Sequence, residues 1–183
     1  MRRSSTSRPT AGRTWTPRRT SSRRTEYRTI EEVTVDEMVT EGVICDFTDK
    51  APGEGVSREE LAEQAERYDL GAGDYLIWDC GMAPEDTDHY LRNFVWPEKG
   101  AAEYMVEKDI TCFAIDALSA DKPGAELHEH DVHYTLLPED ILIIEGVANL
   151  GSVEAGRYDV ICTPIPYANR DGSQCRLLVR PQA

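Results

Sequence analysis

The sequence lacks any long apolar run, since no stretch approaches the roughly 20 apolar residues that a membrane-spanning helix needs. It has only three Phe, its five cysteines show no CxxC spacing, and its basic N-terminus carries no apolar segment of the signal-peptide kind. Hydrophobic residues make up 40% of the 183 positions, which suffices for one domain with a core. We therefore expect a cytoplasmic protein with no membrane contact and with buried, reduced thiols.

Basic residues are scarce outside the first 28 positions. Nine of the 20 Lys and Arg lie in residues 1–28, beside the single acidic residue Glu26, so residues 29–183 carry 11 basic and 33 acidic side chains. A domain this acidic repels phosphate, which argues against nucleic-acid binding. Residues 1–28 are rich in Arg, Ser, Thr and Pro and predict a disordered basic segment.

Strand-like and helix-like patterns alternate after Thr29. Ser57 with Glu60 has the spacing of a capping box, which predicts a helix to about Tyr68, and residues 98–107 predict another. Six apolar runs predict strands; residues 43–47 predict a buried strand, and residues 109–117, apolar on both faces, predict another. These runs are residues 43–47, 74–80, 109–117, 141–150, 157–167 and 175–181. The alternation predicts an α/β domain.

Potential metal ligands concentrate in the motif HEHDVH, which contains His128, His130 and His133 and precedes Glu145. Imidazole and carboxylate together suit zinc, manganese or iron, and such a metal gives a hydrolase an activated water. The spacing alone leaves open a metal site or an exposed loop without metal. A cupin is a third interpretation, because PGAELHEH begins like its signature, although no Glu follows at the cupin spacing.

A longer series of motifs favours one interpretation. The chain contains, in this order, DYLIWDCG, FAIDALSAD, VHYTLL, IIEGVANL, TPIPY and RDGSQCR. The series resembles the cyclase/kynurenine formamidase family of metal-dependent hydrolases. The resemblance implies a three-layer α/β fold of mixed sheet and helices, a homo-oligomer, and hydrolysis of an amide or related C–N bond in a small-molecule substrate. The best-known substrate class is N-formylkynurenine, from tryptophan catabolism.

The same resemblance makes His133 and Glu145 ligands of a divalent metal, zinc or manganese. It places His128 and His130 in a surface loop. Asp121 closes a buried strand with its loop, and we expect it to cap that loop through backbone N–H groups.

The family's main signature, H-x-G-T-H-x-D-x-P-x-H-F, is missing. It supplies three metal ligands and a further histidine, and it should lie in residues 8–22, where the chain has no histidine. Read one nucleotide frame over, each Thr codon contributes AC to a codon that can specify His or Asp. The Thr residues that fall where the signature needs His, His, Asp and His are Thr10, Thr14, Thr16 and Thr20. Trp15 has the single codon TGG, and the codon of Thr16 begins with AC. The shifted codon that spans these two residues is therefore GAC, which specifies Asp at the third of these positions. We hypothesise that residues from about 8 to 25 are an out-of-frame translation of the metal-binding segment, a motif match that the gene sequence tests.

Taken literally, the chain is an N-terminally truncated family domain over residues 29–183. It retains two of the family's metal ligands, His133 and Glu145. The histidine that would transfer protons is lost with the signature, so no catalytic residue is assigned. We therefore expect an arylformamidase-like hydrolase of little or no activity. The alternative is a non-catalytic, degenerate family member that serves as a subunit or binding module, with the basic segment contacting an acidic partner.

Overall fold

The computed structural model describes residues 28–82 and 87–182, with the backbone alone for residues 87–89. The predicted disordered segment and the hypothesised out-of-frame translation lie almost wholly before this part of the chain. No helix within the described ranges is long and apolar enough to cross a membrane.

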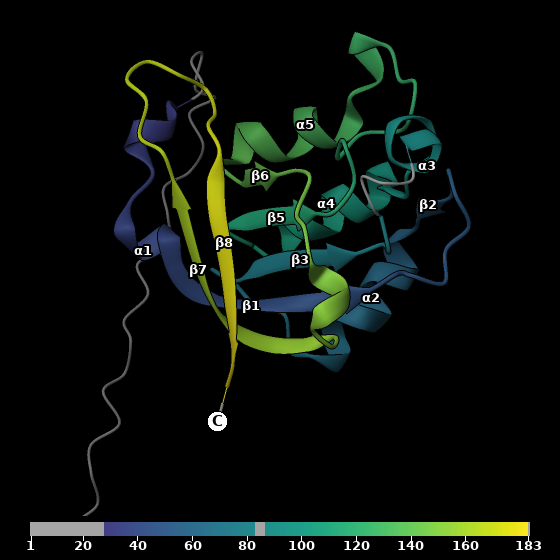
Figure 1. Cartoon of the computed structure of the whole chain (residues 1–183), viewed down its shortest axis with the longest axis horizontal. Helices are drawn as coiled ribbons and strands as arrows, with labels where there is room; N and C mark the ends of the chain where they lie inside the picture. The colour runs from purple at the N-terminus through teal and green to yellow at the C-terminus, as the bar shows by residue number, and fades with distance from the viewer. Residues whose placement is uncertain (1–27, 83–86, 183) are drawn as a thin grey trace, which may run out of the picture.

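Six strands of the described chain form a mixed sheet in the order β6-β5-β3-β1-β7-β8 (Figure 1). The first four of these are parallel to one another, whereas β7 and β8 are antiparallel to their neighbours. The strands are β1 (Val39–Asp46), β3 (Tyr75–Asp79), β5 (Cys112–Ile115), β6 (Leu142–Ile144), β7 (Gly156–Pro164) and β8 (Cys175–Pro181). A separate parallel pair consists of β2 (Gly55–Val56) and β4 (Trp96–Pro97). Each of the six predicted runs overlaps a strand; β1 begins four residues before its run, at Val39, and β5 and β6 are less than half as long as theirs.

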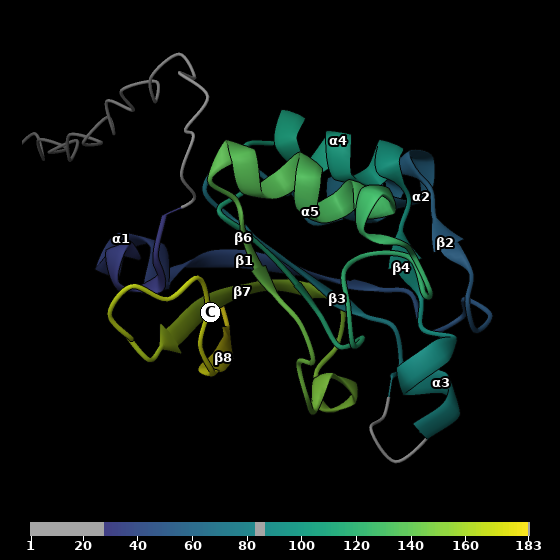
Figure 2. The same cartoon turned by 90° about the horizontal axis from the view of Figure 1, so that it is seen from above.

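Helices α2 (Arg58–Arg67), α4 (Lys99–Glu107) and α5 (Asp131–Leu136) cover one face of the sheet (Figure 2). The predicted capping box begins α2: the Ser57 hydroxyl accepts from the Glu60 N–H at 3.3 Å, and the Glu60 carboxylate accepts from the Ser57 N–H at 2.8 Å. Two other helices, α1 (Val35–Met38) and α3 (Thr87–Arg92), lie outside this layer (Figure 2).

Both faces of β3, of β5 and of the second half of β1 are buried, which explains why these strands are apolar runs without alternation. Buried side chains in β7 are interspersed with exposed ones, and β8 is mostly exposed. On the helix face, Trp78 packs edge-on against Phe113 with ring centroids 5.1 Å apart. On the other face, Tyr75 lies in a second core with Leu150 and Val160. The curled β7–β8 pair and the turn at Leu150, rather than long helices, cover this second face. The predicted α/β class with a mixed sheet and helices is confirmed.

Four cysteines are buried free thiols, as predicted, and Cys175 is exposed, contrary to the prediction. Cys175 is the first residue of β8, and β8 is the edge strand of the sheet, so solvent reaches its side chain.

The carboxyl ends of the parallel strands meet at one edge of the sheet, where ligands of open α/β sheets bind. Asp116 directly follows β5 and is 3% exposed. Its carboxylate accepts the Cys80 N–H at 3.1 Å and the Met82 N–H at 2.8 Å, so that it caps the loop after β3. Burial raises the pKa of Asp116 to about 6 in spite of these hydrogen bonds.

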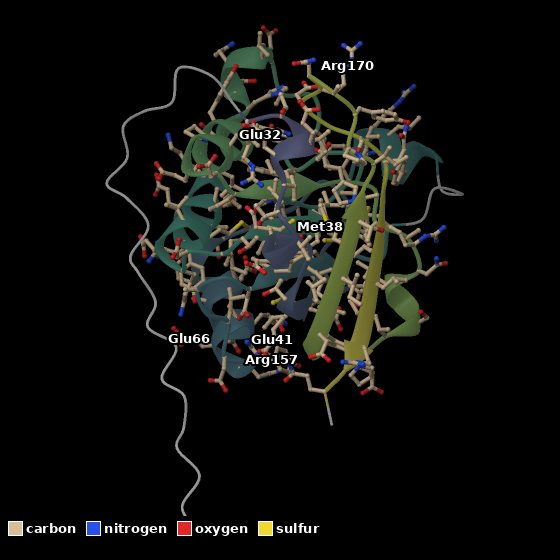
Figure 3. The ribbon with its side chains drawn as sticks, turned by 90° about the vertical axis from the view of Figure 1, so that its left-hand side faces the viewer. Glu32, Met38, Glu41, Glu66, Arg157 and Arg170 are labelled. Carbon is tan, nitrogen blue, oxygen red and sulfur yellow. The ribbon has the colours of Figure 1, made fainter. Side chains whose placement is uncertain are left out.

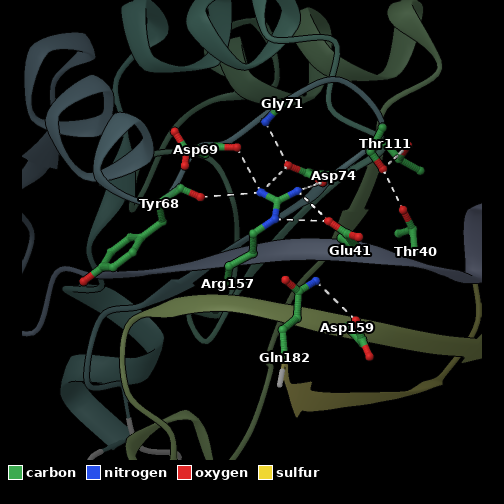
Figure 4. A network of polar contacts seen from close by, with 11 residues as sticks. Thr40, Glu41, Tyr68, Asp69, Gly71, Asp74, Thr111, Arg157, Asp159 and Gln182 are labelled. Carbon is green, nitrogen blue, oxygen red and sulfur yellow. Dashed lines mark hydrogen bonds and ion pairs between the residues drawn. The ribbon is translucent and has the colours of Figure 1, made fainter. Parts of the chain in front are cut away.

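At the opposite ends of these strands, Arg157 of β7 joins three segments (Figures 3 and 4). Its guanidinium donates to both carboxylate oxygens of Asp74, at 2.9 and 3.0 Å, and to Glu41 of β1 at 2.8 Å. It also donates to the carbonyl oxygen of Asp69 at 2.9 Å. Asp74 itself is 4% exposed, so this pairing fixes the entry to β3 against β1 and β7.

Candidate metal centre

The HEHDVH motif spans a single 3-10 turn and the beginning of α5. Residues 127–129 form a 3-10 turn, and His133 lies on α5. His128 is exposed, as expected. His130, just before α5, is partly exposed, and in addition its Nδ1 lies 3.5 Å from a carboxylate oxygen of the buried Asp121.

Asp121 fixes the orientation of the His133 ring. Its Oδ1 accepts the Val132 N–H of α5 at 2.8 Å, and its Oδ2 lies 2.5 Å from His133 Nδ1. Asp121 is 2% exposed, and it follows β5 by a short loop. The predicted capping of backbone N–H groups is confirmed, and the contact with His133 is an additional role. A carboxylate on Nδ1 sets the tautomer of the imidazole and leaves Nε2 as the ligand atom.

The same contact governs the charges of the pair. Burial opposes the ionised form of Asp121, but the hydrogen bonds with His133 and the Val132 N–H, together with the nearby imidazole charges, outweigh burial and lower the pKa of Asp121. The hydrogen bond to Asp121 in turn raises the pKa of His133 above its ordinary value. Asp121 is therefore a carboxylate that favours a proton on His133 Nδ1.

Glu145 directly follows β6, and its side chain lies close to the His133 ring. Its Oε1 accepts the Ala120 N–H at 2.8 Å and lies 3.6 Å from His133 Nε2. The next residue, Gly146, has a φ of +67°, and a Cβ there would approach the Tyr90 hydroxyl to 3.0 Å. The Gly146 N–H donates to the Ala117 carbonyl at 2.9 Å, which holds this segment beside the loop after β5.

The donor chemistry and spacing of His133 and Glu145 fit one metal ion. Bonds of about 2.0–2.2 Å from nitrogen and oxygen place two ligands of a tetrahedral zinc about 3.4 Å apart. The observed separation of 3.6 Å is close to this value. Two donors are fewer than the four ligands of an ordinary zinc site. Within the described ranges, no third His, Cys, Asp or Glu joins this pair closely enough to complete it.

One group of three such donors does occur in the described part: Asp121, His130 and His133. The 2.5 Å separation between Asp121 and His133 is that of a hydrogen bond and is shorter than the spacing of two ligands on one metal. We therefore interpret Asp121 as the residue that orients His133, which leaves the other ring nitrogen, Nε2, available to a metal.

A pocket of about 1000 Å³ opens beside His133 and Glu145. Its walls come from β6, from the ends of β7 and β8 with their connecting loop, and from residues 28–33. The volume is at the upper end of the range, about 300–1,000 Å³, that small-molecule sites occupy. The pair of candidate ligands thus faces a space large enough for a substrate.

Comparisons with known proteins agree with this fold. A profile of the family described as "Putative cyclase" matches residues 16–122, more than half of the chain. The chain belongs to the cyclase family. The matched range ends before His133 and Glu145, so their role as metal ligands stays a prediction.

The chain is also similar to individual proteins of this kind. It is 32% identical over 80 residues to a kynurenine formamidase of Bacillus cereus (strain ATCC 10987 / NRS 248), a match that covers 44% of the chain and 37% of that protein. It superimposes on isatin hydrolase A from Labrenzia aggregata with a TM-score of 0.75 and 18% identity, covering 82% of the chain and 64% of that protein. It also superimposes on a potential metal-dependent hydrolase with cyclase activity, with a TM-score of 0.65 and 24% identity. That match covers 83% of the chain and 70% of the other protein. At these identities the structural likeness establishes the fold.

Sequence reasoning identified His133 and Glu145, and the fold brings them together. It did not foresee that Asp121 holds His133 or that His130 lies next to both. The sequence does contain a signal, the FAIDALSAD motif that ends in Asp121, but its twelve-residue distance from His133 gives no indication of contact.

Proposed function

We propose that this cyclase-family chain is a metal-dependent hydrolase of amide or related C–N bonds, arylformamidase-like, with a weakened metal site. The observation that carries the proposal is the His133–Glu145 pair, whose donor atoms lie 3.6 Å apart at the wall of the large pocket. The similarity to a kynurenine formamidase supports the amide substrate class.

His133 Nε2 and Glu145 Oε1 would hold the metal. A divalent metal bound there would supply an activated water and polarise the scissile carbonyl. Asp121 keeps a proton on His133 Nδ1, which directs the lone pair of Nε2 toward the ion. The Ala120 N–H holds Glu145 Oε1 in place. These two supporting contacts pre-orient the ligands before the metal arrives, which lowers the entropic cost of binding.

The short ligand set predicts weak metal binding and little turnover. Each missing ligand removes a bond that a complete site would make. We therefore expect dissociation constants for zinc or manganese in the micromolar range or weaker. Structural zinc sites, by comparison, have binding free energies of about 10–16 kcal/mol. The imidazole nitrogen of the site favours zinc, whereas its carboxylate also suits manganese, so both metals are tested.

Calorimetric titration of the purified full chain with zinc and with manganese tests the site. We expect one metal ion to bind weakly, and we expect His133→Gln and Glu145→Gln each to abolish this binding. The matched control is His128→Gln, which removes an exposed histidine outside the pair and should leave binding unchanged. Asp121→Asn should weaken binding about 10–100-fold, the usual effect of losing a carboxylate behind a histidine ligand.

Formate release from an aryl formamide, measured with the metal present, tests the activity. We expect slow release that disappears in His133→Gln. Unchanged metal binding in both ligand variants would overturn the proposed site, and rapid turnover would overturn the claim that the site is weakened.

The non-catalytic alternative gains one specific support, the absence of a third donor beside His133 and Glu145 within the described residues. It predicts no formate release at any metal concentration.

A further inference from the structure

Two cysteines lie together in the wall of the large pocket, Cys162 of β7 and Cys175 of β8. The two strands are antiparallel, and their register pairs Cys162 with Leu177 and Pro164 with Cys175. Side chains two residues apart on a strand point to the same face of the sheet. Cys162 and Cys175 are therefore diagonal neighbours on one face of the β7–β8 pair.

The hydrogen-bond pattern of the two strands favours contact between these side chains. The Ile165 N–H donates to the Gln174 carbonyl at 3.1 Å, at the base of the loop between β7 and β8. Because hydrogen-bonded and non-hydrogen-bonded pairs alternate along an antiparallel ladder, Cys162 and Cys175 each belong to a non-hydrogen-bonded pair, in which side chains lie closer together. The two thiols are in hydrogen-bonding contact.

The two thiols differ in their exposure and in their charge. Cys162 is 4% exposed and lies in the core that contains Tyr75, whereas Cys175 is exposed. The Cys162 thiol donates its hydrogen bond to Cys175, which lowers the pKa of Cys175 to about 7. The same contact, together with burial, raises the pKa of Cys162. At neutral pH the pair therefore combines an exposed thiolate with a protonated thiol directly beside it.

This arrangement is the one that reversible thiol oxidation requires, because oxidation is fastest at an accessible thiolate and is completed by a second cysteine within reach. We propose that Cys162 and Cys175 form a redox pair in the pocket wall, in which a hydroperoxide oxidises Cys175 and Cys162 converts the product to a disulfide. The inference is independent of the proposed function, because it requires neither a metal ion nor turnover.

The oxidation proceeds in two steps. The Cys175 thiolate attacks one oxygen of hydrogen peroxide and the O–O bond breaks, which leaves a sulfenic acid on Cys175 and a hydroxide that takes a proton from water. The Cys162 sulfur then attacks the sulfenic sulfur, the S–O bond breaks, and the departing hydroxide leaves as water with the Cys162 proton. In total, two thiols and one hydrogen peroxide give one disulfide and two waters.

The disulfide requires a small movement of β8. Disulfide-linked residues have Cβ atoms about 3.8 Å apart, and diagonal neighbours start farther apart than this. Cys175 is the first residue of an edge strand and follows the loop of residues 165–174, so its backbone can approach β7. The bridge then replaces the thiolate in the pocket wall by a neutral disulfide and fixes the start of β8.

Oxidation of the reduced full chain by hydrogen peroxide at pH 7, with a chelator present, tests the proposal. We expect peptide mass mapping to find one intramolecular disulfide, between Cys162 and Cys175, and we expect dithiothreitol to reduce it. The disulfide closes a short loop within one chain, so it should raise the midpoint of thermal unfolding by about 3–10 °C.

Two variants separate the roles of the pair. In Cys162→Ser the oxidation of Cys175 should stop at the sulfenic acid, which dimedone traps, and the shift in thermal unfolding should disappear. Cys175→Ser changes an exposed side chain, so it serves even if Cys162→Ser fails to fold, and it should form no disulfide. Its reaction with peroxide should be at least about tenfold slower, because burial raises the pKa of the thiols of Cys45, Cys80 and Cys112.

Cys45→Ser is the matched control, because it removes a buried thiol from the core on the helix face of the sheet and should form the same disulfide as the parent. Three results would overturn the proposal. They are a disulfide between two chains, a disulfide that includes Cys112, and a parent chain in which dimedone labels Cys175 while no disulfide forms.

Discussion

Arg157 lies at the amino-terminal ends of the parallel strands. Its replacement by Met should destabilise the fold more than any other single change of a charged residue there. The substitution keeps most of the aliphatic stem and removes the guanidinium. Asp74, which is 4% exposed, would then keep its charge with the Gly71 N–H, at 2.8 Å, as its remaining polar contact to the carboxylate. Figure 4 shows that the guanidinium lies between Asp74, Glu41 and the Asp69 carbonyl.

The magnitude follows from the exposure of each partner. Removing one member of a buried ion pair costs about 3–5 kcal/mol. Because the Arg157 side chain is 28% exposed, water screens part of this interaction, and we expect a loss of about 2–4 kcal/mol. Glu41 is 53% exposed on its side chain, so its pair with Arg157 should contribute about 0–1 kcal/mol.

Urea unfolding followed by circular dichroism measures these differences. The control is Glu41→Gln, which removes the exposed partner and should change the free energy of unfolding by less than about 1 kcal/mol. The double variant Arg157→Met/Asp74→Asn should lose less than the sum of the two single losses, because it no longer leaves a buried charge alone.

Two results would refute this reasoning. One is a loss below about 1 kcal/mol for Arg157→Met, the range of an exposed ion pair. The other is strict additivity in the double variant, which would mean that Arg157 and Asp74 do not interact energetically.

Three further predictions follow from single contacts. The Cys162 thiol hydrogen-bonds to Cys175 and lowers the pKa of Cys175 to about 7, so iodoacetamide should label Cys175 first, with a midpoint near pH 7 that rises toward about 8.5 in Cys162→Ala; preferential labelling of another cysteine would contradict this. Gly42→Ala should lose about 1–3 kcal/mol of unfolding free energy through overpacking, because its Cβ would lie 2.7 Å from the Tyr75 carbonyl oxygen, whereas Gly151→Ala, with open space around it, should be nearly neutral. Asp116 has a folded pKa of about 6 against an ordinary 3.8, so its ionisation opposes folding above pH 6 and the penalty disappears as the pH falls toward 4; its carboxyl carbon should titrate near pH 6 by NMR, and a midpoint near 4 would show that burial does not dominate.

The sequence by itself determined the elements whose causes are local. The Ser57 capping box began α2 because both partners lie within one turn. The apolar runs at residues 43–47, 74–80 and 109–117 gave buried strands, because a strand between a helical layer and a second core has no polar face. The order of the motifs indicated the cyclase family, and His133 and Glu145 were the ligand types that its metal chemistry needs.

Tertiary structure decided every relation that depends on register and packing between distant segments. The tautomer of His133 is set by Asp121, which reaches it because the loop after β5 meets the start of α5 at Val132 and His133. Arg157 meets Asp74 and Glu41 through the placement of β7 beside β1.

Periodicity and propensity report the environment of a residue along its own element, whereas these pairings arise when separate elements pack. For this reason the sequence named the ligands of the candidate metal centre, and the fold supplied what orients them and what shares their pocket.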